Sequence, residues 1–222
     1  MLTLYHCPDA RSFRALWALE ELGRPYALKV LPFPPRVHAK EFLELNPLGT
    51  VPLLIDGDVR MTESAAICQY LATQGTEPSD LAVRPEETDY GTWLNALHQS
   101  DATLTFPQTL VIRYGTLEPA DRRQPQVVED YTRWFYGRLR AVDTALTDRA
   151  YLAASRFTVA DIAVGYALKL AEIIGLSSEF TPRVADYWAR LSDRPAYRAA
   201  MEKQKVETQD EPRLEPIKIG MP

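Results

Sequence analysis

Two short segments of this chain carry residue types that can hold a small peptide by its main chain and its charged end. The first, Asn46-Pro47-Leu48-Gly49-Thr50-Val51-Pro52-Leu53-Leu54, puts a proline at the start of an apolar run that we expect to be a strand. A strand tolerates proline at its first position, because no ladder partner needs the missing N–H there. If the Val51–Pro52 bond is cis, the turn exposes the N–H and C=O of Val51 to the main chain of a ligand.

The second segment, Thr62-Glu63-Ser64-Ala65-Ala66-Ile67, opens a predicted helix with a carboxylate and a hydroxyl. The unpaired N–H groups at a helix start and the positive end of the helix dipole attract a carboxylate. We therefore expect the start of this helix at Ser64 to bind a ligand carboxylate and Glu63 to bind a ligand ammonium group. Together, the two segments predict a site for a zwitterionic peptide.

The order and spacing of these segments resemble those of the glutathione transferase family, whose thioredoxin-like half carries a Val-Pro turn and a Glu/Gln-Ser pair. The similarity extends from Leu2 to about Lys205. It implies that Val51 binds the cysteinyl main chain of glutathione, and that Glu63 and Ser64 bind its γ-glutamyl end.

Further contacts to glutathione also follow from the resemblance. Thr50 stands just before Val51-Pro52, where family members often hold the glycyl carboxylate with Lys or Gln, so its hydroxyl is expected to bind more weakly. His38, at the start of the second predicted helix, is expected to assist.

A transferase of this kind must convert the thiol of glutathione to a thiolate, which requires a hydrogen-bond donor or a positive charge near the sulfur. The loop and helix start between Leu4 and Arg14 are expected to supply it. Serine-type members carry a Ser near this first turn, but the matching position here is Ala10, which has no side-chain donor. Ser12 can take its place, or main-chain N–H groups and Arg11 can do so.

Two other residues of this segment are alternative candidates. Tyr5 ends the first predicted strand, as the Tyr of tyrosine-type members does, although many serine-type members carry a packing Tyr there. The run Cys7-Pro8-Asp9-Ala10 resembles the Cys-Pro-x-Ala of omega-type transferases and the Cys-Pro-x-Cys of glutaredoxins, in which a thiolate forms a mixed disulfide with glutathione. Equally, Cys7 can be a small apolar filler.

These candidates imply different reactions. A Ser or Arg site adds glutathione, the cosubstrate, to an electrophile. The preferred hypothesis is a transferase that conjugates glutathione to a small hydrophobic electrophile or reduces the electrophile with it. A Cys7-dependent thiol transferase or reductase is the first alternative. A non-catalytic protein that binds glutathione or a hydrophobic ligand is the second, because Ala10 lacks a donor. The resemblance further implies a homodimer and an electrophile pocket between two domains, lined by Phe106, Leu110, Arg113 and Tyr114 unless these are ordinary helix residues.

The elements that must position the site follow from apolar patterns and breakers. We predict strands over residues 2–5, 26–31, 52–55 and 59–61 and helices over residues 11–22, 38–45 and 63–73. Asp56-Gly57-Asp58 is a strong turn signal between the last two strands. This order predicts an α/β thioredoxin-like domain with a mixed four-stranded sheet over residues 1–76.

The polar segment 75–85 predicts a linker, followed by an all-α helical-bundle domain over residues 86–222. One helical face is marked by apolar residues three and four apart: Val128, Tyr131, Phe135, Leu139, Val142 and Leu146. Thr158 and Asp161 have the spacing of a capping box, closed by a staple of Phe157 and Ile162, and we assign this motif to folding. Two last helices are predicted over 183–191 and 196–204, and the tail from Glu207 either frays or folds back.

Composition limits the remaining possibilities. The net charge of −5 argues against nucleic acid and an anionic membrane as partners. The chain shows neither a basic-apolar leader nor an apolar run of about 18 residues, so a cytoplasmic protein is predicted. Cys7 and Cys68 do not suggest a disulfide scaffold, and the three scattered histidines do not suggest a metal site.

Overall fold

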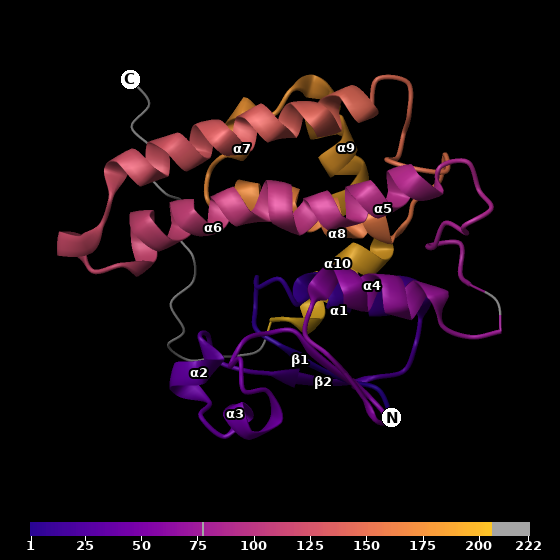
Figure 1. Ribbon diagram of the computed structural model, residues 1–222, viewed down its shortest axis with the longest axis horizontal. Coiled ribbons are helices and arrows are strands. Elements are labelled where there is room, and N and C mark those ends of the chain that lie inside the picture. The colour runs from indigo at the N-terminus through magenta and orange to yellow at the C-terminus, as the bar shows by residue number, and fades with distance from the viewer. Residues whose placement is uncertain (77, 206–222) are drawn as a thin grey trace. The chain divides into compact units, whose positions relative to one another are not determined.

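The computed structural model describes residues 1–76 and 78–205, which form two compact units. The first unit is Met1–Ala82 together with the described residues from Leu191 onward, and the second is Val83–Arg190 (Figure 1). The chain's last helix therefore packs with the first unit. The boundaries drawn from the sequence stay a prediction, and the tail from Glu207 lies outside the described residues.

The first unit contains a four-stranded mixed sheet, as predicted, and its strand order is β2-β1-β3-β4. The parallel pair is β1 and β2, whereas β3 pairs antiparallel with both β1 and β4. The strands are β1 (Thr3–His6), β2 (Ala27–Val30), β3 (Leu53–Asp56) and β4 (Val59–Met61). Asp56 pairs with Val59 across the predicted turn, where Gly57 adopts a left-handed φ of 58°.

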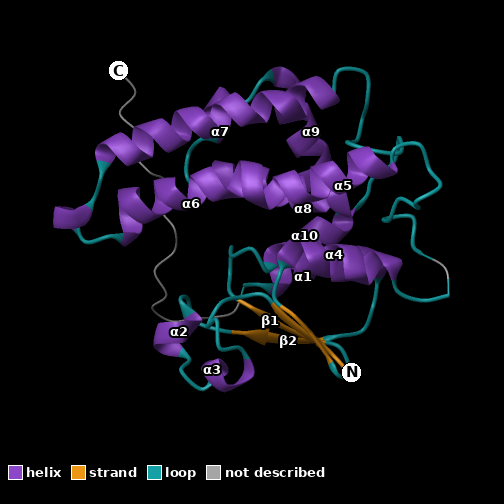
Figure 2. Ribbon diagram, in the orientation of Figure 1, coloured by secondary structure: helices purple, strands orange, loops and turns teal. Residues whose placement is uncertain are grey.

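Helices of the first unit lie on both faces of this sheet (Figure 2). They are α1 (Phe13–Leu22), α2 (Pro35–His38), α3 (Phe42–Leu45), α4 (Ser64–Thr73) and α10 (Pro195–Lys203). The predicted helix over 38–45 is wrong in outline, because two one-turn helices occupy this region. Pro35 opens α2 at a position that suits proline's fixed φ, so His38 ends a helix instead of starting one.

In the second unit, α8 is the central element. It is buried at every position from Val159 to Ala171, well beyond the predicted stripe, and the buried positions include the charged residues Asp161 and Lys169. Around it lie α5 (Tyr90–Gln99), α6 (Phe106–Ile112), α7 (Pro125–Ala145) and α9 (Pro182–Ser192), and α8 itself spans Val159–Ile173. π-Helical turns at Ser100–Thr105 and Arg113–Leu117 flank α6. In the part of the chain that the structure describes, no helix is both long and apolar enough to cross a membrane.

The predicted capping box at the start of α8 is confirmed. The Thr158 hydroxyl accepts from the N–H of Ala160 at 3.3 Å, while Asp161 Oδ2 accepts from the Thr158 N–H at 2.8 Å. The other oxygen, Oδ1, accepts from the Leu152 N–H at 3.0 Å and the Tyr187 hydroxyl at 2.7 Å. One buried carboxylate thus connects the loop before α8 with α9.

Candidate functional site

The strand register brings the three predicted site segments to one edge of the sheet. Tyr5 pairs with Leu53 and Leu54 pairs with Met61, both in antiparallel ladders. In an antiparallel pair the residues after one strand lie beside those before the other. The loop after β1, the Val-Pro turn before β3 and the start of α4 after β4 therefore meet at the same end.

The Val-Pro turn presents a main chain that is available to a ligand. The Val51–Pro52 bond is cis, and the N–H and C=O of Val51 make no hydrogen bond within the described chain. Pro52 is buried, whereas Val51 is half-buried and packs with Tyr5 against a cluster around Phe42. An extended peptide can therefore pair with Val51 as a short strand would.

Two residues before this turn hold it in place. Asn46 donates from Nδ2 to the Thr50 carbonyl at 2.8 Å and accepts the Leu48 N–H at 3.2 Å. Gly49 has a φ of 60°, and a Cβ there would lie 2.7 Å from the Cβ of Arg36. Glycine is required at this position, because any side chain would clash and would strain the left-handed conformation.

The start of α4 offers donors and a free carboxylate. Glu63 is exposed at the N-cap, and among the described residues its side chain has no hydrogen-bond or ion-pair partner. Ser64 Oγ accepts from Arg14 Nη1 at 3.0 Å, so its O–H proton stays available to a ligand. Arg14 is fully buried on α1 and adds positive charge behind the helix start. Arg14 is not among the site residues predicted from the sequence, although a cation within an apolar helix segment is a signal that could have found it.

Ser12 points into the protein. It is fully buried, its Oγ lies 2.7 Å from His6 Nδ1, and it accepts the Cys7 N–H at 3.3 Å. Its hydroxyl is therefore committed to holding the loop after β1, and this placement favours a structural role over contact with glutathione.

Cys7 and Tyr5 also have structural surroundings. Cys7 is 0% exposed, with its Sγ 3.7 Å from the Pro32 carbonyl oxygen, so a substrate sulfur cannot reach it in this conformation. The ring of Tyr5 lies 5.3 Å from that of Phe42, centroid to centroid, within the cluster that supports Val51. Both placements fit packing residues.

We expect Cys7→Ala to conjugate glutathione at the wild-type rate, because a buried thiol takes no part in a reaction at the surface. The substitution should lower only the free energy of unfolding, by about 1 kcal/mol, as expected for a small cavity in a core. The assay is initial rates of aryl halide conjugation and of disulfide reduction with glutathione. Cys68→Ala is the matched control, since burial raises the pKa of that thiol to about 12. Loss of disulfide reduction in Cys7→Ala alone would restore the Cys7 hypothesis.

Arg11 is the predicted candidate with a cationic side chain in the segment between β1 and α1. Pro8, Asp9, Ala10 and Arg11 are all half-buried, unlike the fully buried Ser12. Ala10 has no donor in its side chain, and the N–H groups of Cys7, Asp9 and Ala10 are hydrogen-bonded within the protein. Arg11 and the N–H groups that follow Ala10 stay the predicted donors to a thiolate.

His38 and Thr50 are exposed, and Thr50 adjoins the Val-Pro turn. Their proposed part in holding glutathione stays a prediction. Among residues 1–76 and 78–205, no group of three or more His, Cys, Asp or Glu side chains could hold a metal ion.

The residues proposed for the electrophile share one partly open face of the second unit. Phe106 is 46% exposed, Leu110 and Tyr114 are half-buried and Arg113 is exposed. The ring of Phe106 lies 6.3 Å from that of Tyr131 on α7, so this face is aromatic. Phe106, Leu110 and Tyr114 are therefore partly accessible to an apolar ligand. Arg113 forms an ion pair with Glu118 at 3.0 Å.

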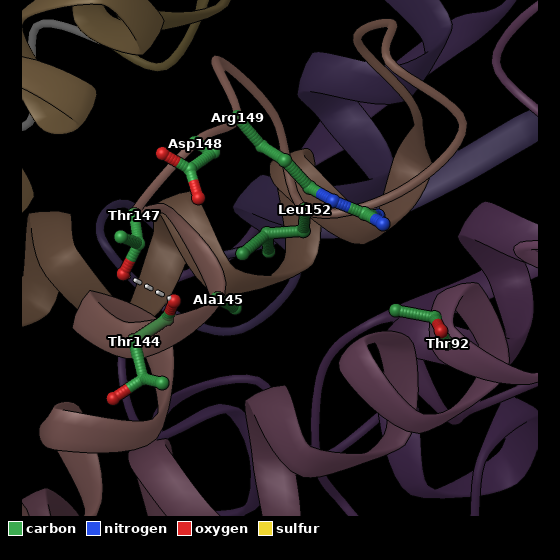
Figure 3. Close-up of a pocket in the computed structure, with 7 residues that line it drawn as sticks. All are labelled: Thr92, Thr144, Ala145, Thr147, Asp148, Arg149 and Leu152. Carbon is green, nitrogen blue, oxygen red and sulfur yellow. Dashed lines mark hydrogen bonds between the residues drawn. The ribbon is translucent and has the colours of Figure 1, made fainter.

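A separate cavity of about 320 Å³ lies in the second unit (Figure 3). Its side chains come from α5, the end of α7 and the loop that follows: Thr92, Thr144, Ala145, Thr147, Asp148, Arg149 and Leu152. The Thr147 hydroxyl donates to the Thr144 carbonyl at 2.8 Å. None of the predicted site residues lines this cavity.

Comparison with known proteins matches both halves of the chain. The model of the glutathione S-transferase N-terminal domain matches residues 10–74, and that of the C-terminal domain matches residues 112–195. Glutathione S-transferase 3 of Schizosaccharomyces pombe is 28% identical, covering 94% of this chain and 90% of that protein. Glutathione S-transferase GstA of Escherichia coli O157:H7 is 27% identical, covering 90% and 97%.

Solved structures give the same result. A sphingomonad glutathione S-transferase complexed with glutathione superposes with a TM-score of 0.80 at 26% identity, covering 92% of this chain and 99% of that one. The ternary complex of BphK, a bacterial transferase, has a TM-score of 0.81 at 24% identity and supports the fold. With a mixed sheet, a Val-Pro turn beside the start of α4 and two matched domains, the chain belongs to the glutathione transferase family.

Proposed function

We propose that this enzyme binds glutathione along the sheet edge where its three site segments meet. Val51 pairs with the cysteinyl main chain, the start of α4 at Ser64 holds the γ-glutamyl carboxylate, and Glu63 holds the ammonium group. The observation that carries the proposal is the unengaged main chain of Val51 at the same edge as the unpaired Glu63 carboxylate. The buried cation of Arg14 behind Ser64 further favours a bound carboxylate.

The chemistry that follows is conjugation. Arg11 and the N–H groups of the loop after β1 stabilise the thiolate, and the thiol proton passes to solvent. The sulfur then donates an electron pair to an electrophilic carbon. With an aryl halide the S–C bond forms and the C–halogen bond breaks, and halide leaves with its electron pair. Holding the thiolate against the electrophile supplies the rest of the rate.

Conjugation fits the site better than the alternatives. A Cys7-dependent reductase needs an accessible thiol, and Cys7 is buried. A binding protein without catalysis was suggested by Ala10, but the relatives that match this chain are glutathione S-transferases, and Arg11 follows Ala10 as a predicted cationic group. A small hydrophobic electrophile at the Phe106 face, a homodimer and a cytoplasmic location are the remaining parts of the proposal.

Glu63→Gln should weaken glutathione binding by about tenfold to a hundredfold, because a charged hydrogen bond contributes about 1.5 to 3 kcal/mol. Titration calorimetry with glutathione measures the dissociation constant, and conjugation of a generic aryl halide measures turnover. The control is Glu172→Gln, which changes an exposed carboxylate in the second unit.

Two outcomes would contradict the proposal. The first is a wild-type protein that gives no heat with millimolar glutathione and no conjugation above the uncatalysed rate. The second is a Glu63→Gln variant that binds glutathione as tightly as Glu172→Gln does.

A further inference from the structure

A reciprocal pair of hydrogen bonds links the loop after β1 to the end of α10. The Asp9 N–H donates to Gln204 Oε1 at 3.1 Å, and Gln204 Nε2 donates to Asp9 Oδ1 at 2.9 Å. The residues are 195 positions apart, yet both belong to the first unit. Gln204 is 5% exposed, so its amide is an interior group and not a surface side chain.

Asp9 occupies the most constrained position of that loop. The Ala10 N–H donates to the Cys7 carbonyl at 3.2 Å, with Pro8 and Asp9 between them, and Asp9 has a φ of 57°. Proline at the second position and a positive φ at the third define a type II turn, whose third residue is usually glycine. Aspartate is less favourable than glycine at a positive φ, although it adopts this conformation more often than most other residues. Unlike glycine, Asp9 has a side chain that accepts a hydrogen bond from Gln204.

Gln204 is held firmly enough to act as an anchor. Figure 1 shows α10 beside α1, and the Tyr197 ring packs edge-on against Trp17 at 5.0 Å between centroids. The charged side chains of α10 that face α1 are paired. Arg194 binds Glu21 through two bonds of 2.6 and 2.8 Å, and Lys203 binds Glu20 at 2.7 Å. The amide of Gln204 therefore projects from a helix fixed against α1.

We propose that Gln204 is a positioning residue for thiol activation. By clamping both the main chain and the side chain of Asp9, it fixes the turn that sets Arg11 and the adjacent N–H groups toward the glutathione sulfur. The inference rests on the proposed function, since it assigns a role to the loop that activates the thiol. Gln204 acts through Asp9 and does not itself touch the substrate.

The test compares wild type with Gln204→Ala in two measurements. One is the pKa of bound glutathione, followed by thiolate absorbance across pH, and the other is kcat and KM for glutathione in aryl halide conjugation. We expect the thiol pKa to rise by about half a unit or more and kcat near neutral pH to fall about tenfold, because small displacements of catalytic groups are costly. KM should change less than about twofold, since the Val51 and Glu63 contacts are intact.

Matched variants separate positioning from general stability. Arg198→Ala removes an exposed ion pair between α10 and Asp193 without touching α1 or Asp9, and it should leave kcat and the thiol pKa unchanged. Asp9→Asn keeps an acceptor and tolerates a positive φ, so it should retain activity, whereas Asp9→Ala should behave like Gln204→Ala. The double variant Asp9→Ala/Gln204→Ala should be little worse than either single one, as expected for residues that act together.

A folded Gln204→Ala with wild-type kcat and thiol pKa overturns the inference even if its melting temperature falls. If Gln204→Ala does not fold, equal kcat values for Asp9→Ala and Asp9→Asn overturn it, and a lower value for Asp9→Ala supports it. A wild-type protein that neither binds nor conjugates glutathione overturns the proposed function as well. If the wild-type protein conjugates glutathione and Gln204→Ala has the same kcat and thiol pKa, only this inference is overturned.

Discussion

Replacing Arg11 with alanine should raise the pKa of the glutathione thiol in the complex by about one unit. An opposite charge within about 4 to 6 Å favours the ionised form of an acid by about one to three pKa units. The lower end of this range applies, because Arg11 is only half-buried and water screens its charge. Below the new pKa the variant has a smaller thiolate fraction than wild type. At saturating glutathione and pH 6.5, kcat/KM for the aryl halide should therefore drop about tenfold.

The pH dependence distinguishes this effect from a loss of binding. Because a nearby cation lowers the thiol pKa, removing it moves the rising limb of the pH–rate profile to higher pH, and the two enzymes converge above both pKa values. Arg11→Lys keeps the charge and should lie close to wild type. Arg60→Ala, which removes an exposed arginine from β4, is the control. An unshifted profile in Arg11→Ala would assign thiol activation to the main-chain N–H groups instead.

The elements that carry the proposed glutathione-binding residues could be predicted because their signals are local. A proline before a strand, an Asp-Gly turn and a Glu-Ser helix start each act through residues next to one another. The capping box at Thr158 and Asp161 is another local pattern, and the structure confirms it. The sheet then follows from joining such elements in order.

The thiol-activating half was harder to predict, because the direction of a loop side chain depends on distant partners. Ser12 and Cys7 were plausible by residue type, yet both point inward. Part of the reason is that side chains alternate between the two faces of β1, so that Leu4 and His6 are its buried residues. Ser12 is hydrogen-bonded to His6 and is therefore buried beside it. The contact of Asp9 with Gln204 crosses nearly the whole chain, and no neighbouring residues encode it.

The largest effect on stability is expected at Asp161. Its carboxylate accepts four bonds, from the N–H groups of Leu152 and Thr158 and the hydroxyls of Thr158 and Tyr187, at 2.7 to 3.0 Å. Burial raises the pKa of Asp161, and these bonds oppose that rise by stabilising the charged form. In Asp161→Ala the donors lose their acceptor inside the protein, and each buried unsatisfied group costs about 1 to 3 kcal/mol. Partial relaxation leaves an expected loss of about 3 to 5 kcal/mol.

Thermal unfolding followed by circular dichroism should show this loss as a fall in Tm of about 10 °C. Asp148→Ala removes an exposed aspartate from the same unit and should change stability by less than about 0.5 kcal/mol. Thr158→Ala, which removes the cap but leaves the Leu152 and Tyr187 bonds, should fall between them, at about 0.5 to 2 kcal/mol. Well below its Tm the folded Asp161→Ala enzyme should keep its kcat, because the carboxylate touches no predicted site residue. If Asp161→Ala has the same Tm as Asp148→Ala, the carboxylate does not organise the start of α8. In that case the burial of the helix alone must hold the second unit together.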